Sequence, residues 1–471
     1  QNGSGGTLQN TVGAAMTFNN AGNFDIRSID ITNPASGRGI SLDNAIGVNF
    51  LRSARITGIG SNQTGIDWDN DSAGGAALSV QSTLFQGAMG VTSSRGIEFG
   101  SSANYNATLT IDDTGGVAAD SIFERLQRQA VSAVTGTTSS GTVNVTIRDT
   151  IFRNAEDATN GDNGLQFSAN GAASMIVLLD DLTLNSIARS GAGTSTINVI
   201  SGGNGTITGT IRDSSFVDLH TEGIRAGTGT NATGTFVFDN NDFDDIGMEA
   251  IAVAVIGDSS ADVTITNNRI GTVSAVGDGQ GFNGFERAAV SLGVSDNSGD
   301  VLTALIQNNT IAHTDAPSSS FNRPVLDVDV EDGDTANLTI LGNTFTQHGA
   351  GEGVNLRLRG DNSASSLRVD LNSANVAANA NTSNAGYALF HNGGANQGTF
   401  AFEFDLSDAV VNDAGPFTDA QIETFLSARN TGAVTTPNNQ DDFDGVASVA
   451  TPLLFAPPPK TPTTSISNST D

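Results

Sequence analysis

Residues 143–152 read Val-Asn-Val-Thr-Ile-Arg-Asp-Thr-Ile-Phe, and residues 175–184 read Met-Ile-Val-Leu-Leu-Asp-Asp-Leu-Thr-Leu. Both stretches begin with alternating apolar residues, continue with a polar pair and end on a large apolar residue. The same pattern ends again at Phe216, Phe243, Ile270, Ile311, Phe345 and Val376, and weaker copies end at Ile56, Phe85 and Phe123. The ten intervals between Ile56 and Val376 average 32 residues, and further copies near Ile31 and Leu406 bring the total to about a dozen. A fixed period of this length is typical of a solenoid.

Each repeat contains a second alternating run, such as residues 251–255 and 354–358. The period of two predicts strands rather than helices. Because the pieces follow one another in the same order in every repeat, stacking the repeats in register places like strands side by side and parallel. Parallel crossovers are right-handed almost without exception. The sequence therefore predicts an all-β fold, a right-handed parallel β-helix of about 12 coils.

The pattern also predicts which side chains point inward. Counted back from the large apolar residue, the fifth and seventh positions are apolar, as in Ile147 and Val145 or Ile265 and Val263. Stacked coils place such residues over one another at about 4.8 Å. The 24 Phe against two Tyr and one Trp suggest an interior without partners for a hydroxyl or an indole N–H.

Two further columns are expected where the first strand of each repeat ends. Asn recurs two positions before the large apolar residue, which predicts a structural ladder of side-chain amides rather than a ligand site, formed by Asn241, Asn268, Asn309 and Asn343. A simple preference of turns for Asn, which tolerates the left-handed conformation, is the alternative. The residues Arg148, Asp180, Arg212 and Asp239 alternate in sign and predict a ladder of charge pairs.

With its recurring Asn-x-Phe or Asn-x-Ile after a β run, the chain resembles the right-handed parallel β-helix (pectin-lyase-like) superfamily. In style it is similar to the passenger regions of bacterial autotransporters and other surface β-helix proteins. The resemblance covers about residues 20–406. It implies the fold, whereas members of the superfamily include lyases, hydrolases, phage tailspikes, adhesins and structural surface proteins.

Composition excludes several classes of protein. The 471 residues carry 50 acidic and 20 basic side chains, a net charge of −30, and Lys460 is the single lysine. Nucleic-acid binding needs clustered positive charge, so we expect none. No apolar run reaches 18 residues, so no membrane span is expected in this chain. The absence of Cys excludes disulfides, and the acidic, Lys-poor composition favours an extracellular location on a bacterial cell surface.

The ends of the chain differ from its middle. We expect residues 1–20 to form an N-terminal cap or edge, 21–406 the β-helix, 407–436 a C-terminal cap and 437–471 an acidic, Pro-rich linker or tail. Within the cap, Thr418 and Gln421 match a capping box, and apolar residues at helical spacing follow before Gly432. These features predict a short helix that covers the open edge of the last coil.

Two acidic runs are candidate calcium sites, because carboxylates at alternate positions of a loop suit a hard cation. One is Asp67, Asp69 and Asp71, and the other is Asp327, Asp329 and Glu331. Neither matches an EF-hand loop, and solvated strand faces are the alternative explanation. The carboxylates of Asp149, Asp181 and Asp213 share one offset in three successive repeats. Stacked like charges repel unless a cation or the neighbouring arginines intervene, and both solutions stay open.

No catalytic residue is assigned. The Gly-His-Gly and Arg-x-Lys motifs of the glycoside-hydrolase members of the resembled superfamily are missing. The four histidines, His220, His313, His348 and His391, share no offset. The run from Gly279 to Gly284 matches the dinucleotide fingerprint in its letters only, because a strand pattern rather than a helix follows it.

The sequence therefore predicts an extracellular structural or adhesive protein, a rigid rod that self-associates into a filament or surface layer, or binds surface glycans. The alternatives are a glycan-binding adhesin without turnover and a polysaccharide-active lyase or hydrolase. The enzyme would use residues 271–288 or 313–325 as groove walls.

Overall fold

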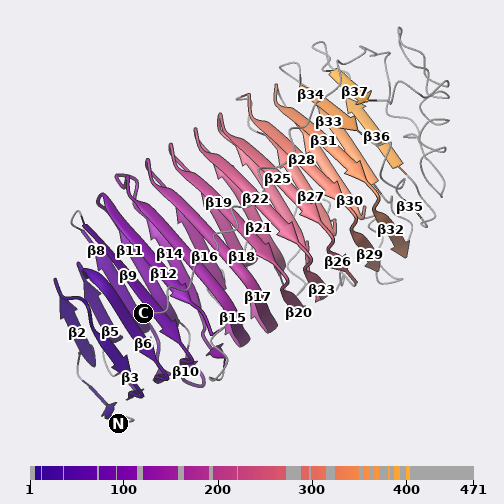
Figure 1. Ribbon diagram of the computed structural model, residues 1–471. Helices are drawn as coiled ribbons and strands as arrows, with labels where there is room; N and C mark the ends of the chain where they lie inside the picture. Colours follow the sequence, from indigo (N-terminus) through magenta and orange to yellow (C-terminus); the bar gives the residue numbers. More distant parts are fainter. Residues whose placement is uncertain are drawn as a thin grey trace, which may run out of the picture.

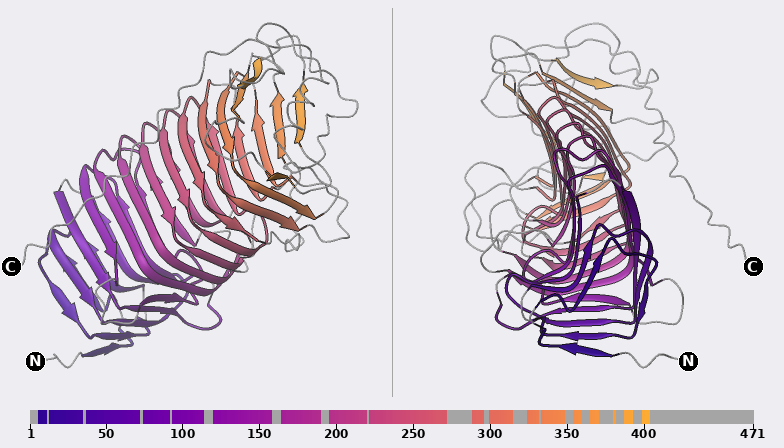
Figure 2. Two further views of the ribbon diagram at one scale, coloured as in Figure 1. Left: turned by 45° about the vertical axis from the view of Figure 1, so that its right-hand side comes forward. Right: turned by 90° about the vertical axis from the view of Figure 1, so that its left-hand side faces the viewer.

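The computed structural model describes residues 6–403, except 12, 35–36, 72–73, 92, 114–119, 158–163, 190–194, 220, 272–287, 296–298, 315–323, 332, 349–353, 360–364, 371–379, 382–386 and 393–398. The described residues form 37 strands and no helix. Every strand pairing among them that joins successive coils is parallel, as between β19 (Thr206–Arg212) and β22 (Thr233–Asp239). Figures 1 and 2 show these strands stacked along one axis, from the indigo end of the chain to the orange end.

Each coil contributes strand segments to three faces of the solenoid. The third face is a separate sheet of 13 strands, whereas the first and second faces join into one sheet of 24 strands. They join because β15 (Thr142–Asp157) and β17 (Ser174–Arg189) run through the corner without a break.

The strands of each face have the following bounds. The first face contains β15, β17, β19 and β22 together with β3 (Asp25–Arg27), β6 (Gly47–Arg52), β9 (Gly74–Gln81), β12 (Tyr105–Ile111), β25 (Ser260–Thr266), β28 (Val301–Gln307), β31 (Thr335–Leu341), β34 (Ser366–Asp370) and β37 (Thr399–Glu403). The second face contains the later halves of β15 and β17 together with β1 (Thr7–Gln9), β4 (Asp30–Thr32), β7 (Arg55–Ile59), β10 (Leu84–Gly87), β13 (Ser121–Glu124), β20 (Ser215–Leu219), β23 (Asp242–Ile246), β26 (Arg269–Ile270), β29 (Thr310–Thr314), β32 (Thr344–His348) and β35 (Ala380–Asn381). The third face contains β2 (Met16–Asn19), β5 (Arg38–Asp43), β8 (Thr64–Asn70), β11 (Arg95–Ser101), β14 (Val131–Thr135), β16 (Leu165–Ala169), β18 (Ser195–Ser201), β21 (Glu222–Gly229), β24 (Ile251–Ile256), β27 (Val290–Val294), β30 (Leu326–Val330), β33 (Val354–Arg359) and β36 (Tyr387–Asn392).

The predicted fold class is confirmed: the chain is an all-β parallel solenoid. The number of coils differs from the expected dozen, since the third face has 13 strands among the described residues. Part of the difference in coil number arises at the beginning of the chain. There β1 and β2 belong to a coil of their own and pair in register with β4 and β5 of the next coil. The helix predicted between Thr418 and Gly432 lies outside the described residues.

The core is a set of stacked columns, and the predicted inward positions are confirmed. Val145 and Ile147 of β15 pair with Val177 and Leu179 of β17, and all four side chains are buried. Burial of this kind stabilises the fold by about 25 cal/mol for each Å² of apolar surface removed from water.

Aromatic rings stack in the same way from coil to coil. Phe216 lies over Phe243 with ring centroids 4.4 Å apart, and Phe85 lies over Phe123 at 4.6 Å. The expectation that the interior offers no partner to a hydroxyl was wrong. Tyr105 is buried in β12 and donates its hydroxyl hydrogen to the carbonyl of Ala45, and its burial raises the pKa to about 12.

The corner between the first and second faces is closed by one residue in the left-handed conformation. Its φ lies between 45° and 63° in ten coils, at Ser28, Ser53, Ser82, Asp149, Asp181, Asp213, Asn240, Asn267, Asn308 and Gly342. Ser, Asp, Asn and Gly tolerate this region better than other residues. The bend therefore falls one position before the ladder asparagines, so turn preference does not account for Asn241 and its counterparts.

Those asparagines point inward and bond from coil to coil. The side-chain oxygen of Asn268 accepts hydrogen bonds from the backbone N–H of Asn241 at 2.9 Å and from its side-chain amide at 3.0 Å. The Asn268 amide in turn donates to the Asn309 side chain at 3.0 Å and to the Phe238 carbonyl at 2.9 Å. Asn309 bonds Asn343 with the same geometry, and all four side chains are buried. The ladder thus satisfies polar groups that no solvent reaches.

We expect Asn268→Ala to destabilise the protein by about 3 kcal/mol, because it leaves several buried donors and acceptors without partners. Chemical denaturation followed by circular dichroism measures the change. Asn267→Gly is the matched control, since Asn267 is exposed in the left-handed conformation that Gly342 adopts in a later coil. It should shift stability by less than about 0.5 kcal/mol. Equal losses in the two variants would contradict a special role for the ladder.

Candidate functional site

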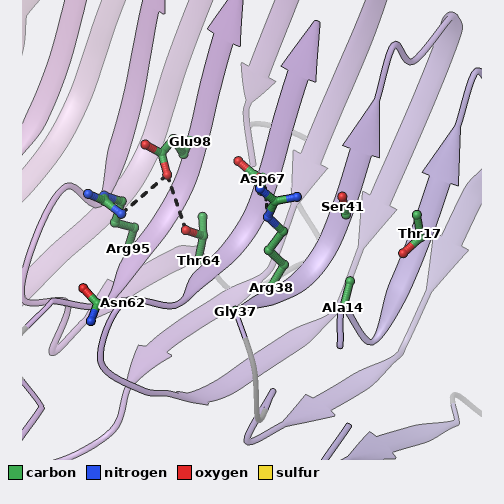
Figure 3. Close-up of a pocket in the computed structure, with 10 residues that line it drawn as sticks. All are labelled: Ala14, Thr17, Gly37, Arg38, Ser41, Asn62, Thr64, Asp67, Arg95 and Glu98. Carbon is green, nitrogen blue, oxygen red and sulfur yellow. Dashed lines mark hydrogen bonds and ion pairs between the residues drawn. The ribbon is translucent and has the colours of Figure 1, made fainter. Parts of the chain in front are cut away.

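A polar groove of about 610 Å³ lies on the outer side of the third face, near the beginning of the solenoid. We call it the third-face groove. Figure 3 shows its side chains on neighbouring strands, among them β5, β8 and β11. It is lined by Ala14, Thr17, Gly37, Arg38, Ser41, Asn62, Thr64, Asp67, Arg95 and Glu98.

Strand alternation positions these side chains. In β8, Ile66 and Trp68 are buried in the core, so Asp67 between them points outward. The parallel register then aligns Asp67 with Ser41 of β5 and with Glu98 of β11. Three polar groups from three coils therefore stand in one row, about 4.8 Å apart.

An arginine from a neighbouring coil partly neutralises Asp67. Nε of Arg38 lies 2.5 Å from Oδ2 of Asp67, and the two side chains are 52% and 13% exposed. Burial raises the pKa of the Asp67 carboxyl above its usual range, while Arg38 opposes the rise and Glu98 adds to it. The middle of the row therefore presents a carboxylate whose charge is only partly compensated.

Arg95 forms the second charged part of the groove. Its Nη1 lies 3.7 Å from Oε2 of Glu98, and its Nε donates to Oε1 of Gln129 at 3.1 Å. The hydroxyl of Thr64 donates to the same Glu98 oxygen at 3.4 Å. Gln129 continues the chain of contacts to Gln166 of β16 at 3.2 Å. Donors and acceptors thus alternate along the groove, an arrangement suited to a ligand rich in hydroxyl groups.

The same row continues along the third face. The register carries it from Glu98 through Ser132, Gln166 and Asn198 to Arg225, whose guanidinium lies 2.6 Å from the buried Glu222. The third face is therefore polar and paired in charge well beyond the groove.

The first predicted calcium run is divided between two environments. Asp67 and Asp69 both point outward from β8, and Asp67 faces Arg38. Asp71 follows the strand and accepts a hydrogen bond from the Ser102 hydroxyl at 2.6 Å.

An arginine also lies against the second run. Nη2 of Arg357 is 2.5 Å from Asp327 and 3.4 Å from Asp329, and Asn355 donates to Asp327 at 2.9 Å. Glu331 follows β30, where its backbone N–H bonds the Val294 carbonyl. The described part of the chain contains no group of three or more His, Asp or Glu placed to hold a metal ion. Calcium binding at either run stays a prediction.

The charge ladder predicted at the corner of the first and second faces is confirmed for Arg148, Asp180 and Arg212, whereas Asp239 accepts hydrogen bonds from Thr266 and Asn267. Asp180 lies between two arginines, 3.4 Å from Arg148 and 2.7 Å from Arg212. The adjacent left-handed acids Asp149, Asp181 and Asp213 line a slot of about 250 Å³ together with Arg148 and Asp180. Burial and a hydrogen bond with Asp181 raise the pKa of Asp149 to about 6. Below about pH 6 a proton on Asp149 therefore relieves its repulsion with Asp181.

Because the pKa of Asp149 is raised in the folded state, its favourable contribution is present at low pH and is lost as the pH rises from about 4 through about 6. Asp149→Asn keeps a neutral side chain that tolerates the left-handed conformation, as Asn240 does. We expect the variant to match the wild type below pH 4 and to exceed its stability by less than about 1 kcal/mol at neutral pH, because water screens the pair. Thermal melting across this range measures the difference, and Asp245→Asn, a left-handed aspartate on the second face, is the control. A stability difference that does not vary with pH would contradict the proton on Asp149.

Of the groove residues, the sequence singled out only Asp67, and it missed Arg38, Thr64, Arg95 and Glu98. The signal that was available is the shared register of two columns, one with Arg38, Thr64 and Arg95 and the other with Asp67 and Glu98. The side chains of the four histidines lie outside the described residues, as do most of residues 271–288 and 313–325.

Comparison of the chain with protein-family models, with curated proteins and with solved structures found no match. The part of the chain that the structure describes contains no helix of the length and apolar character needed to cross a membrane. The parallel β-helix architecture is thus shown by the structure itself.

Proposed function

We propose that this protein is an adhesive rod of the bacterial cell exterior that binds neutral, hydroxyl-rich glycans in the third-face groove. The observation that carries the proposal is the row of alternating donors and acceptors around Arg38–Asp67 and Arg95–Glu98. Charged hydrogen bonds to hydroxyl groups are among the stronger polar contacts that such a groove offers.

The architecture supports a role as a rigid spacer. Among the described residues, thirteen coils at about 4.8 Å give a stack roughly 60 Å long. The net charge of −30 disfavours acidic polymers at long range and limits lateral pairing of rods, so a neutral glycan is the better ligand. The resemblance to the pectin-lyase-like superfamily and to autotransporter passengers is compatible with this location.

A polysaccharide-active enzyme is the second candidate, and one observation favours it. The groove holds two carboxylates on adjacent strands, Asp67 and Glu98, and the pKa of Asp67 is raised. Glycoside hydrolysis uses such a pair, with one carboxyl protonated and one ionised.

A glycan array probed with the full chain tests the proposal, and titration calorimetry then measures the affinity for any neutral oligosaccharide retained. We expect Arg38→Ala with Arg95→Ala to weaken binding by about tenfold or more, which corresponds to about 1.4 kcal/mol. Arg55→Ala is the control, because Arg55 is an exposed arginine of the second face. Binding that survives the double substitution would contradict the groove as the site. Release of reducing ends, lost in Asp67→Asn or Glu98→Gln, would favour the enzyme instead.

A further inference from the structure

The outer side of the first face carries threonines in a two-dimensional array. The strands β12, β15, β17, β19, β22, β25, β28 and β31 each present three outward side chains, in three columns fixed by the parallel register. We call these 24 positions the threonine face. Thirteen of them are threonines: Thr108, Thr110, Thr142, Thr146, Thr206, Thr208, Thr210, Thr233, Thr235, Thr264, Thr303, Thr335 and Thr339.

Strand propensity alone does not explain this array. Thr suits any half-buried strand surface, so propensity would distribute it over all three faces. The outward row of the third face contains none in the corresponding strands, where it reads Ser132, Gln166, Asn198, Arg225, Ala252, Ser291, Asp327 and Asn355. The threonines are therefore concentrated on the first face relative to the third, and the second face carries fewer of them, among them Thr183.

The threonine face is also nearly uncharged. Asp262 is the one ionisable side chain among its 24 positions, although the chain carries a net charge of −30. The remaining positions hold Ser, Asn and five aliphatic side chains. Such a surface offers no charge complementarity, so its ligand must itself be uncharged.

Most of the hydroxyls are available to a ligand. Among the described residues, these threonines make one hydrogen bond through their side chains, from Thr233 to Thr206 at 3.1 Å. The Thr208 and Thr210 side chains are half-buried in β19, and the Thr206 side chain of the same strand is exposed. Each hydroxyl is both a donor and an acceptor.

The array repeats in two directions, about 4.8 Å between coils and about 6.6 Å between alternate residues of a strand. A folded protein partner does not require a periodic binding surface, whereas a crystal lattice does. Water molecules in ice form an uncharged lattice of donors and acceptors with repeats close to these spacings. A crystalline polysaccharide fits less well, because sugar rings favour aromatic platforms and none of the 24 side chains is aromatic. We propose that the threonine face binds ice.

Partitioning of the purified full-length chain into slowly growing ice tests this proposal, with thermal hysteresis as a second readout. We expect the wild type to be enriched in the ice. Thr208→Lys, at the centre of the face, should reduce the enrichment by about tenfold, since an ammonium group has no place in the lattice. Thr183→Lys is the matched control, because Thr183 is an exposed threonine on the second-face half of β17. It introduces the same charge away from the threonine face and should leave the enrichment unchanged.

Three outcomes would overturn the proposal: exclusion of the wild type from ice, equal effects of the two substitutions, and retention on crystalline cellulose or chitin without enrichment in ice. A dimer in sedimentation that Thr208→Lys alone dissociates would also overturn it, by assigning the face to a second copy of the chain. Circular dichroism confirms that both variants fold. The third-face groove is not altered in this test, so its result is independent of glycan binding.

Discussion

The structure depends on parallel backbone hydrogen bonding that keeps the coils in register. Adjacent strands lie about 4.8 Å apart, so each side chain meets the residue at the same position one coil above and one coil below. Contact between like residues is favourable for apolar and amide side chains and unfavourable for carboxylates. The choice of residue in each column follows from this constraint. The rings of Phe216 and Phe243 stack face to face, and the amides of Asn241 and Asn268 bond head to tail.

Carboxylates that stack in one column repel each other, and the chain compensates this repulsion in three ways. Where the column alternates in sign, Asp180 lies between Arg148 and Arg212 and needs no other compensation. One position further along, Asp149 faces Asp181, and Asp149 keeps its proton at a pH where an isolated carboxyl would have lost it. On the third face an arginine from the neighbouring coil takes this role, as Arg38 does for Asp67 and Arg357 for Asp327. With 19 arginines in the chain, these placements account for a considerable part of its positive charge.

The repeat was sufficient to predict the strands, the parallel stacking and the inward positions, because alternation and period are local properties of the sequence. It was not sufficient to locate the bend, since Asn240 and Asn241 are the same residue type and the sequence does not distinguish the left-handed one, Asn240, from its neighbour. Tyr105 was missed because its partner, the Ala45 carbonyl, is 60 residues away in the sequence. The groove was missed for a related reason. Arg38 and Asp67 belong to different coils whose lengths differ, so their proximity follows from the register and not from a motif.

The outer surfaces of the first and third faces differ because the connections at the corners beside them differ in length. Two residues join β19 to β20, and the first–second corner repeats the left-handed bend in ten coils, so the first face keeps one register over many strands. The longest intervals fall at the other side of the second face, for example between Ile270 of β26 and Val290 of β27. Insertions at that corner border the third face and leave the first unaltered. A periodic, uncharged surface is therefore possible on the first face, while individual ion pairs such as Arg38–Asp67 are distributed over the third. Solenoids tolerate this separation because each coil needs only its neighbours to be stable.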